Sequence, residues 1–135
     1  NDLKPMCTGW AYNANIKVGM DTLTPTTFNT NELINPNTNS PNSFTGTNIL
    51  NSSPGLWKIT FTGTWNAGVI TGTIGEIGLY LAPFDNITTN WVEYNIQKPQ
   101  KLVARISSAD GTFSAFTPDI EKVFTVEWTV SCGMV

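Results

Sequence analysis

The sequence predicts an all-β fold, an antiparallel β-sandwich or jelly roll with long irregular loops and little or no helix. Apolar and polar residues alternate with period two in several segments, and no segment carries apolar residues at helical spacing. Gly, Pro, Asn and Ser clusters interrupt these segments at short intervals. The chain has 135 residues, the size of one ordinary domain, so residues 1–135 are expected to form a single sandwich.

The clearest strands are expected at residues 57–65 and 123–132. In both, large apolar side chains alternate with Thr, Ser or a single charged residue. This pattern is typical of an antiparallel strand with one face in the core and the other in solvent. The expected core side chains are Trp57, Ile59, Phe61, Trp65, Phe124, Val126, Trp128, Val130 and Cys132.

Shorter strands are expected at residues 10–18, 74–81, 101–107 and 112–116. Ala109-Asp-Gly-Thr112 separates the last two and predicts a hairpin turn, because glycine tolerates a positive φ. A cluster of glycines around the middle strands predicts tight turns, bulges or close approach of strands: Gly63, Gly68, Gly72, Gly75 and Gly78.

Two long segments, residues 22–54 and 83–100, are expected to be irregular. The first is long for a loop in a compact domain, so it either hides a strand near residues 44–50 or carries function at the rim. Residues 118–121 are expected to form one helical turn at most.

The charge pattern excludes several classes of partner. The net charge is −3, and the seven Lys and Arg residues are scattered along the chain. We therefore expect no binding to nucleic acid or to an anionic membrane. No apolar stretch approaches the roughly 18 residues that a membrane span requires.

Catalytic chemistry has few candidate residues here. The chain has no His, which removes the usual general base and the commonest metal ligand. Glu76 and Glu127 alternate with apolar neighbours and are expected to face solvent. Asp85, Asp110 and Asp119 are expected in turns, capping them through Asx hydrogen bonds, with a calcium site at a loop apex as the alternative. We predict that the protein is not an enzyme and has no catalytic residue, cofactor or bound metal.

Cys7 and Cys132 lie near opposite ends of the chain. A disulfide between them would tie the terminal strands together and stabilise the fold by about 5 kcal/mol in the loop-entropy description. The alternative is two buried free thiols. The chain begins at Asn1, which indicates either a processed leader, and hence export, or a fragment.

Four aromatic residues lie outside the regular alternation: Trp10, Tyr12, Trp91 and Tyr94. They are candidates for surface contacts, stacking on sugar rings or filling a partner's pocket, and the alternative is that they cover the core under a loop. The sequons beginning at Asn51 and Asn86 are glycosylation sites only if the source organism glycosylates Asn.

The second half of the chain resembles a recurrent module of bacteriophage tail-fibre and minor virion structural proteins. The resemblance rests on the strings at residues 74–81 (IGEIGLYL), 102–107 (LVARIS) and 124–130 (FTVEWTV), with residues 16–19 and 24–26 matching the module's opening. It implies a β-sandwich on the outside of a virion, as a tail or neck appendage or a capsid decoration. It also implies a homo-oligomer, often a trimer, that contacts other virion subunits or a host surface. No catalytic residue is implied.

Two alternatives stay open from the sequence. The chain can be an extracellular filament or surface-layer subunit, in which Asn1 to Pro5 would be donated as a strand to the next subunit. It can also be a carbohydrate-binding module that recognises a surface glycan. All three readings place the protein on the virion exterior or outside the cell.

Overall fold

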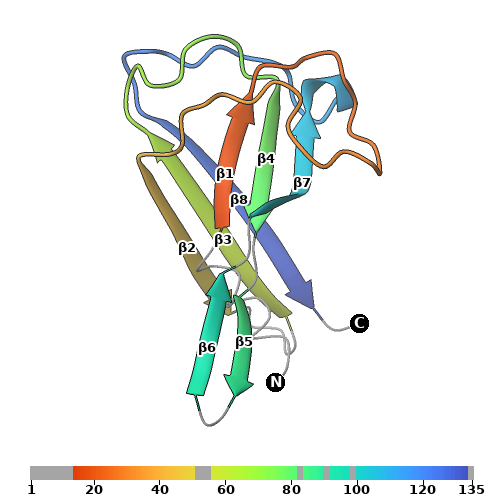
Figure 1. Ribbon diagram of the computed structural model, residues 1–135. Coiled ribbons are helices and arrows are strands. Elements are labelled where there is room, and N and C mark those ends of the chain that lie inside the picture. The colour runs from red at the N-terminus through yellow and green to blue at the C-terminus, as the bar shows by residue number, and fades with distance from the viewer. Residues whose placement is uncertain (1–13, 51–55, 82–83, 90–91, 98–99, 134–135) are drawn as a thin grey trace.

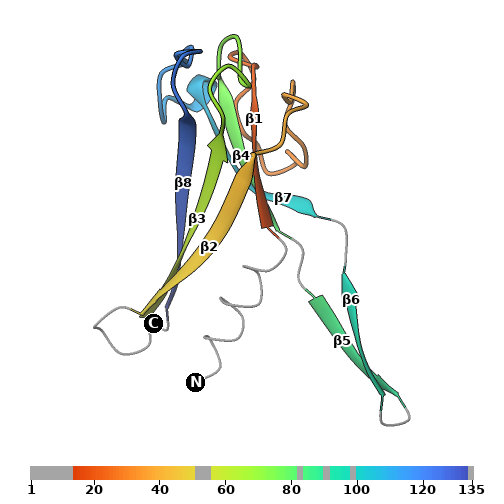
Figure 2. The same ribbon diagram turned by 90° about the vertical axis from the view of Figure 1, so that its left-hand side faces the viewer.

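The computed structural model describes residues 14–50, 56–81, 84–89, 92–97 and 100–133. Two antiparallel three-stranded sheets face each other (Figures 1 and 2). One sheet has the order β1 (Ala14–Gly19), β4 (Glu76–Leu81), β7 (Lys101–Ser107), and the other has the order β2 (Ser43–Leu50), β3 (Leu56–Trp65), β8 (Phe124–Gly133). The predicted all-β sandwich is confirmed. The only helical element among the described residues is a 3-10 turn, η2 (Ser108–Asp110).

The core lies between the two sheets and follows the predicted alternation. Fully buried side chains come from β1, from the odd-numbered positions of β3 and β4, and from the loop between them: Ile16, Val18, Ile59, Phe61, Trp65, Ile70, Ile74, Ile77, Leu79 and Leu81. Strand β8 packs half-buried side chains against this core, namely Phe124, Val126, Trp128 and Val130. The side chains of Trp57 and Cys132 lie outside the described part, although their backbones are paired in β3 and β8.

The strand predicted within the first long segment is confirmed as β2. The strand predicted at residues 10–18 is observed from Ala14 onward, and the residues before it lie outside the described part. Its last residue, Gly19, forms a single bridge with Pro36, which brings the following loop back to the sheet.

The hairpin predicted after β7 is wrong. Ser107 accepts a hydrogen bond from the amide of Ala109, and Gly111 closes the turn at φ 76°, so the positive φ is confirmed but the turn is 3-10. The hydroxyl of Thr112 then donates to the carbonyl of Ser107 at 3.0 Å. These local bonds direct the chain out of the sheet, and only Phe116 pairs again, in a bridge with Ile74.

The segment 83–100 is not irregular as predicted, because it contains a two-stranded hairpin, β5 (Phe84–Thr89) and β6 (Val92–Gln97). Asp85 therefore lies in a strand and not in a turn. Figure 2 shows the hairpin extending away from both sheets. Residues 118–121 form a turn without a helix, in which Asp119 accepts from the amide of Glu121 at 2.9 Å, the Asx bond expected there.

Candidate interaction surface

The outer face of the β1-β4-β7 sheet is covered by the loop that joins β1 to β2, which we call the cover loop (residues 20–42). All six residues of β4 are buried, including Glu76 and Tyr80 on the face away from the core. Glu76 has a relative exposure of 0 %, so the prediction that it faces solvent is wrong. Alternation placed it correctly on the outer face, but the loop folds over that face.

The carboxylate of Glu76 holds the cover loop and one strand together. It accepts a hydrogen bond from Nε of Arg105 at 3.0 Å and from the backbone amides of Ile34 at 2.9 Å and Asn35 at 2.8 Å. A buried carboxylate is tolerated only when its charge is paired and its oxygens are hydrogen-bonded. Here the loop backbone and the β7 guanidinium provide both.

Arg105 fixes the first half of the cover loop. Its Nη1 donates to the carbonyl of Thr24 at 3.0 Å and to the hydroxyl of Thr26 at 2.8 Å, and its Nη2 lies 3.5 Å from a carboxylate oxygen of Asp21. Only 1 % of the Arg105 side chain is exposed. The guanidinium therefore binds both Glu76 of β4 and the loop, in the fixed fork geometry that suits several acceptors at once.

Asp110 anchors the same loop from outside. It accepts from the amide of Thr26 at 2.8 Å, and hydrogen bonding to the side chain and then the backbone of Thr26 lowers the pKa of its carboxyl group. The turn position predicted for Asp110 is confirmed, but its bond joins two distant segments and is not a local cap. Among the described residues, no three Asp, Glu, Cys or His side chains converge as they would around a metal ion.

Two glycines let the cover loop lie directly on the sheet. A Cβ atom at Gly78 would lie 2.7 Å from Leu102 and 2.9 Å from Leu33, and one at Gly75 would overlap the carbonyl oxygen of Asp21. The close strand approach expected at these glycines is observed at Gly78, where Leu102 belongs to the neighbouring strand β7. The cover loop approaches at both positions, which the sequence did not indicate.

Tyr80 provides a further attachment for the loop. Its hydroxyl accepts from the amide of Leu33 at 3.3 Å and donates to a carboxylate oxygen of Glu32 at 3.2 Å. Burial raises the pKa of the Tyr80 phenol, and the neighbouring carboxylates add to the shift. On the edge strand of the sheet, the ammonium of Lys17 lies 4.5 Å from the centre of the ring.

The anchored loop carries a tight turn at residues 27–30. The amide of Thr30 donates to the carbonyl of Thr27 at 3.1 Å, and the amide of Thr27 donates to the hydroxyl of Thr30 at 2.9 Å. Phe28 occupies the turn and is fully exposed. An aromatic ring held in solvent by a hydrogen-bonded turn is typical of a contact residue, because little side-chain entropy is lost on binding.

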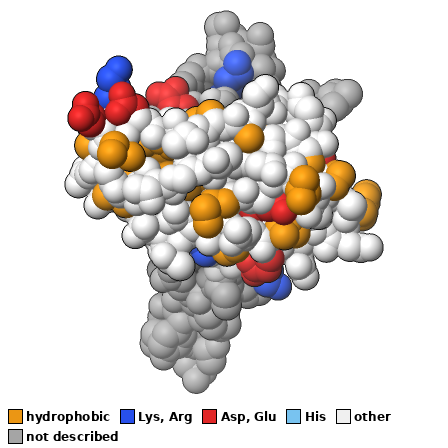
Figure 3. Space-filling model, turned by 90° about the horizontal axis from the view of Figure 1, so that it is seen from above, with side chains coloured by type: hydrophobic (Ala, Val, Ile, Leu, Met, Phe, Trp, Pro, Cys, Tyr) orange, Lys and Arg blue, Asp and Glu red, His pale blue; other side chains and the backbone are white. Residues whose placement is uncertain are grey.

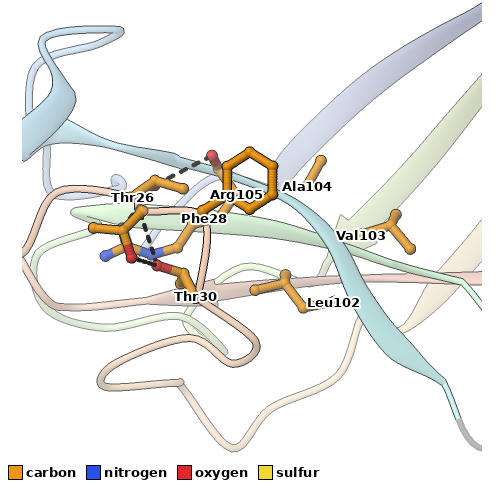
Figure 4. A pocket seen from close by; sticks show the side chains of 8 residues that line it. Thr26, Phe28, Thr30, Leu102, Val103, Ala104 and Arg105 are labelled. Atoms are coloured by element: carbon orange, nitrogen blue, oxygen red, sulfur yellow. Dashed lines mark hydrogen bonds between the residues drawn. The ribbon is translucent and has the colours of Figure 1, made fainter.

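A hollow of about 240 Å³ lies between this turn and β7 (Figure 4). Pairing between β4 and β7 shifts by one residue at Leu79 and Tyr80, which places both Ala104 and Leu102 in register and leaves Val103 as the extra residue. Val103 is 54 % exposed. The hollow is lined by Thr26, Thr27, Phe28, Thr30, Leu102, Val103, Ala104 and Arg105.

Exposed apolar side chains gather at the end of the sandwich where the cover loop and residues 111–123 run, the upper end in Figure 1. Seen from that end, hydrophobic side chains lie in patches on a surface with few charged groups (Figure 3). The exposed large apolar residues from these two loops are Met20, Leu23, Phe28, Ile34, Phe116, Ile120 and Val123.

The outer face of the β2-β3-β8 sheet is different, because no described loop covers it. Its threonines pair across strands: the hydroxyls of Thr60 and Thr129 are 2.9 Å apart, and those of Thr64 and Thr125 are 3.3 Å apart. Glu127 is exposed on this face, as predicted.

Most of the predicted contact residues fall outside the described part. This holds for Cys7, Trp10, Tyr12 and Trp91. Tyr94 and Cys132 lie in β6 and β8 with only their backbones described, so the disulfide and the four-aromatic surface stay predictions.

The structure instead brings Phe28, Val103 and Arg105 together around the hollow and pairs Arg105 with Glu76. The sequence singled out Glu76 only as a solvent-facing residue, and it did not single out the other three. The one available signal for the turn was an aromatic residue alone in a polar string, Thr26-Thr-Phe-Asn-Thr30. Nothing in the sequence paired it with β7.

Comparisons with family models, curated proteins and solved structures found no match to this chain. No helix in the described residues is long and apolar enough to cross a membrane.

Proposed function

We propose that this protein is a non-enzymatic structural subunit of a bacteriophage virion, placed in a tail or neck appendage or on the capsid as a decoration. The strings that resemble the phage module lie in β4, β7 and β8. β4 is the central strand of one sheet, β7 is an edge strand of that sheet, and β8 is an edge strand of the other sheet. In this proposal the protein sits on the virion exterior as a homo-oligomer, trimeric in the form that the resemblance implies, and contacts virion subunits or a host surface.

The β5-β6 hairpin is the observation that best supports a role in assembly. Among the described residues its two strands pair only with each other, and neither joins a three-stranded sheet. It extends from the sandwich at the end opposite the cover loop (Figures 1 and 2). An isolated two-stranded hairpin is marginally stable in water, so an arm of this kind gains stability when a neighbouring subunit packs against it.

The buried charges support a structural role as well. Glu76 and Arg105 face each other and fill their remaining bonds with loop groups, so neither is presented to a substrate. A catalytic carboxylate needs a path to the reacting atom and is held within hydrogen-bond reach of it.

The experiment is immunogold labelling of particles from the producing culture, with antibodies raised against the purified chain. Label at a tail, neck or capsid position is expected. Label on particle-free filaments, or on no particle at all, would contradict the proposal. A variant with residues 84–97 replaced by a short Gly-Ser linker should keep the thermal unfolding of the sandwich and lose incorporation into particles.

A filament or surface-layer subunit is the second candidate, because both outer strands of the β2-β3-β8 sheet are open. Within the described part of the chain, no strand pairs with the free edge of β2 or with the free edge of the ten-residue β8. Such an edge accepts an additional strand. Deleting residues 1–5, the proposed donor, would abolish filaments in this case and leave virion incorporation unchanged in the first.

A carbohydrate-binding module is the third candidate, carried only by the predicted aromatic residues. A glycan array with the purified chain tests it, and absence of binding across the array removes it.

A further inference from the structure

The turn at residues 27–30 and the adjoining hollow form one surface with a projection beside a depression. Phe28 stands fully exposed at the rim of the hollow, and Val103 is exposed on its β7 side (Figure 4). We call Thr26, Thr27, Phe28, Thr30 and Val103 the Phe28 surface. A projection beside a depression within one surface allows an isologous two-fold contact, because each copy offers both halves.

The Phe28 surface is fixed in place before any partner arrives. The amide of Thr26 is held by Asp110, the hydroxyl of Thr26 by Arg105, and the turn is closed by Thr27 and Thr30. Preorganisation lowers the entropy cost of association. Burying the charges of Glu76 and Arg105 costs desolvation free energy. The loop that they hold exposes a phenylalanine, and this arrangement gains an advantage when the phenylalanine contacts a partner.

Charges at the two ends of β7 complement each other under a two-fold rotation. Lys101 begins the strand, and Asp110 lies in the 3-10 turn just after it; both are exposed. Within the described residues, Lys101 makes no ion pair. Arg105 lies between Lys101 and Asp110 in the chain, and its charge is balanced by Glu76 and Asp21. In an antiparallel pair of copies, each Lys101 therefore faces the partner's Asp110, and no like charges meet at the centre.

Strand addition along β7 is not the mode of contact. The carbonyls of Arg105 and Ser107 already accept hydrogen bonds from the hydroxyls of Thr26 and Thr112, at 3.4 and 3.0 Å. Loop threonines thus occupy acceptors of this strand that an added strand would need. The contact must be made by side chains across the loop and the strand.

We propose that the Phe28 surface binds a second copy of this chain, in an antiparallel two-fold contact that places Phe28 of each copy in the hollow of the other. The inference rests on the proposed function and deepens it by naming a partner for a subunit; this two-fold contact is separate from the three-fold one that the resemblance implies. One aromatic anchor and one ion pair per copy make a small interface, so the isolated pair is weak and dissociates at micromolar concentrations.

Sedimentation velocity of the full chain between about 10 and 500 µM tests the proposal at the concentrations expected of a weak interface. The weight-average mass should rise toward the dimer as concentration increases. Phe28→Ser should weaken self-association at least tenfold without a change in thermal unfolding, because the side chain is exposed in the monomer. The matched control is Ile120→Ser, which removes an exposed apolar side chain from the other loop and should leave self-association unchanged.

A charge-swap series tests the orientation. Lys101→Glu and Asp110→Lys should each weaken self-association, and the double variant should restore part of it, an outcome that a merely structural role of Asp110 does not produce. A monomeric mass at every concentration, or equal effects of Phe28→Ser and Ile120→Ser, would overturn the proposal. A monomeric mass at every concentration would mean that the partner of the Phe28 surface is another macromolecule and not a second copy of this chain. Particle labelling tests the virion location independently of self-association, so the location and the two-fold contact fail separately.

Discussion

Glu76 and Glu127 look alike in the sequence and differ completely in the structure. Each sits between apolar residues in a strand and points away from the core, Glu76 in β4 and Glu127 in β8. Glu127 is exposed on an uncovered face, whereas Glu76 is fully buried under the cover loop and paired with Arg105. Period-two alternation therefore assigns a side chain to one of two faces, but it cannot tell whether a loop will cover the outer face.

The largest expected effect on the free energy of unfolding comes from neutralising Glu76, and the same change at Glu127 is the comparison. Glu76→Gln should lower the free energy of unfolding by about 3–5 kcal/mol, because it leaves the buried guanidinium of Arg105 without its closest countercharge. Glu127→Gln should change it by less than about 0.5 kcal/mol, as is usual for an exposed position. Urea unfolding of the two variants measures both values. Equal effects would show that Glu76 is solvated.

A second comparison uses the central strand of each sheet. Gly78→Ala should cost about 1–3 kcal/mol, because the added Cβ meets Leu102 and Leu33 beneath the cover loop. Gly63→Ala, in β3, should cost less, since its nearest neighbour is a side-chain carbon of Pro41 at 3.2 Å, which lies in a loop and can shift. Thermal unfolding compares the two. A tolerated alanine at Gly78 would mean that the loop does not rest on the sheet.

Because of Tyr80, the free energy of unfolding is expected to depend on pH in the alkaline range. Its pKa is raised in the folded state, so its contribution to stability is fully present below the unfolded pKa of about 10 and is lost as pH rises through the folded value. Tyr80→Phe should cost about 1–2 kcal/mol at neutral pH, because the amide of Leu33 loses its acceptor. Its unfolding free energy should then fall less steeply above pH 10 than that of the natural chain. Parallel alkaline profiles would contradict the assignment.

The smallest effect is expected at Asp110, where the loop anchor is exposed to solvent. Its pKa is lowered by the bonds from Thr26, so its contribution is present above the unfolded pKa of about 4 and is lost as pH falls through the folded value. Asp110→Asn keeps an acceptor for the Thr26 amide and removes the charge. Acid titration of the unfolding free energy should show a shallower decline for this variant, and an unchanged slope would exclude the bond.

The sequence predicted what depends on alternation. The fold class and the core faces of β3, β4 and β8 follow from which side chains share a face. The strand within the first long segment was one of two alternatives raised by the length of that segment. Gly75 and Gly78 also indicated a close approach of strands, but not the approach of the cover loop.

The remaining features depend on contacts between distant segments. Arg105 meets Asp21 and Thr24 only because the cover loop returns to β7, and this needs the three-dimensional path of residues 20–42. The same is true of Asp110, whose partner Thr26 lies 84 residues away in the chain. The β5-β6 hairpin escaped prediction, and its two strands form a sheet separate from the two sheets of the sandwich.

Amide hydrogen exchange at Ile34 and Asn35 tests most directly whether the Glu76 carboxylate keeps the cover loop closed on the sheet. Both amides donate to that carboxylate, so in the natural chain they should exchange as slowly as the amides of β4, and in Glu76→Gln they should exchange much faster while the β3 amides stay protected. Rapid exchange at these two positions in the natural chain would contradict the account.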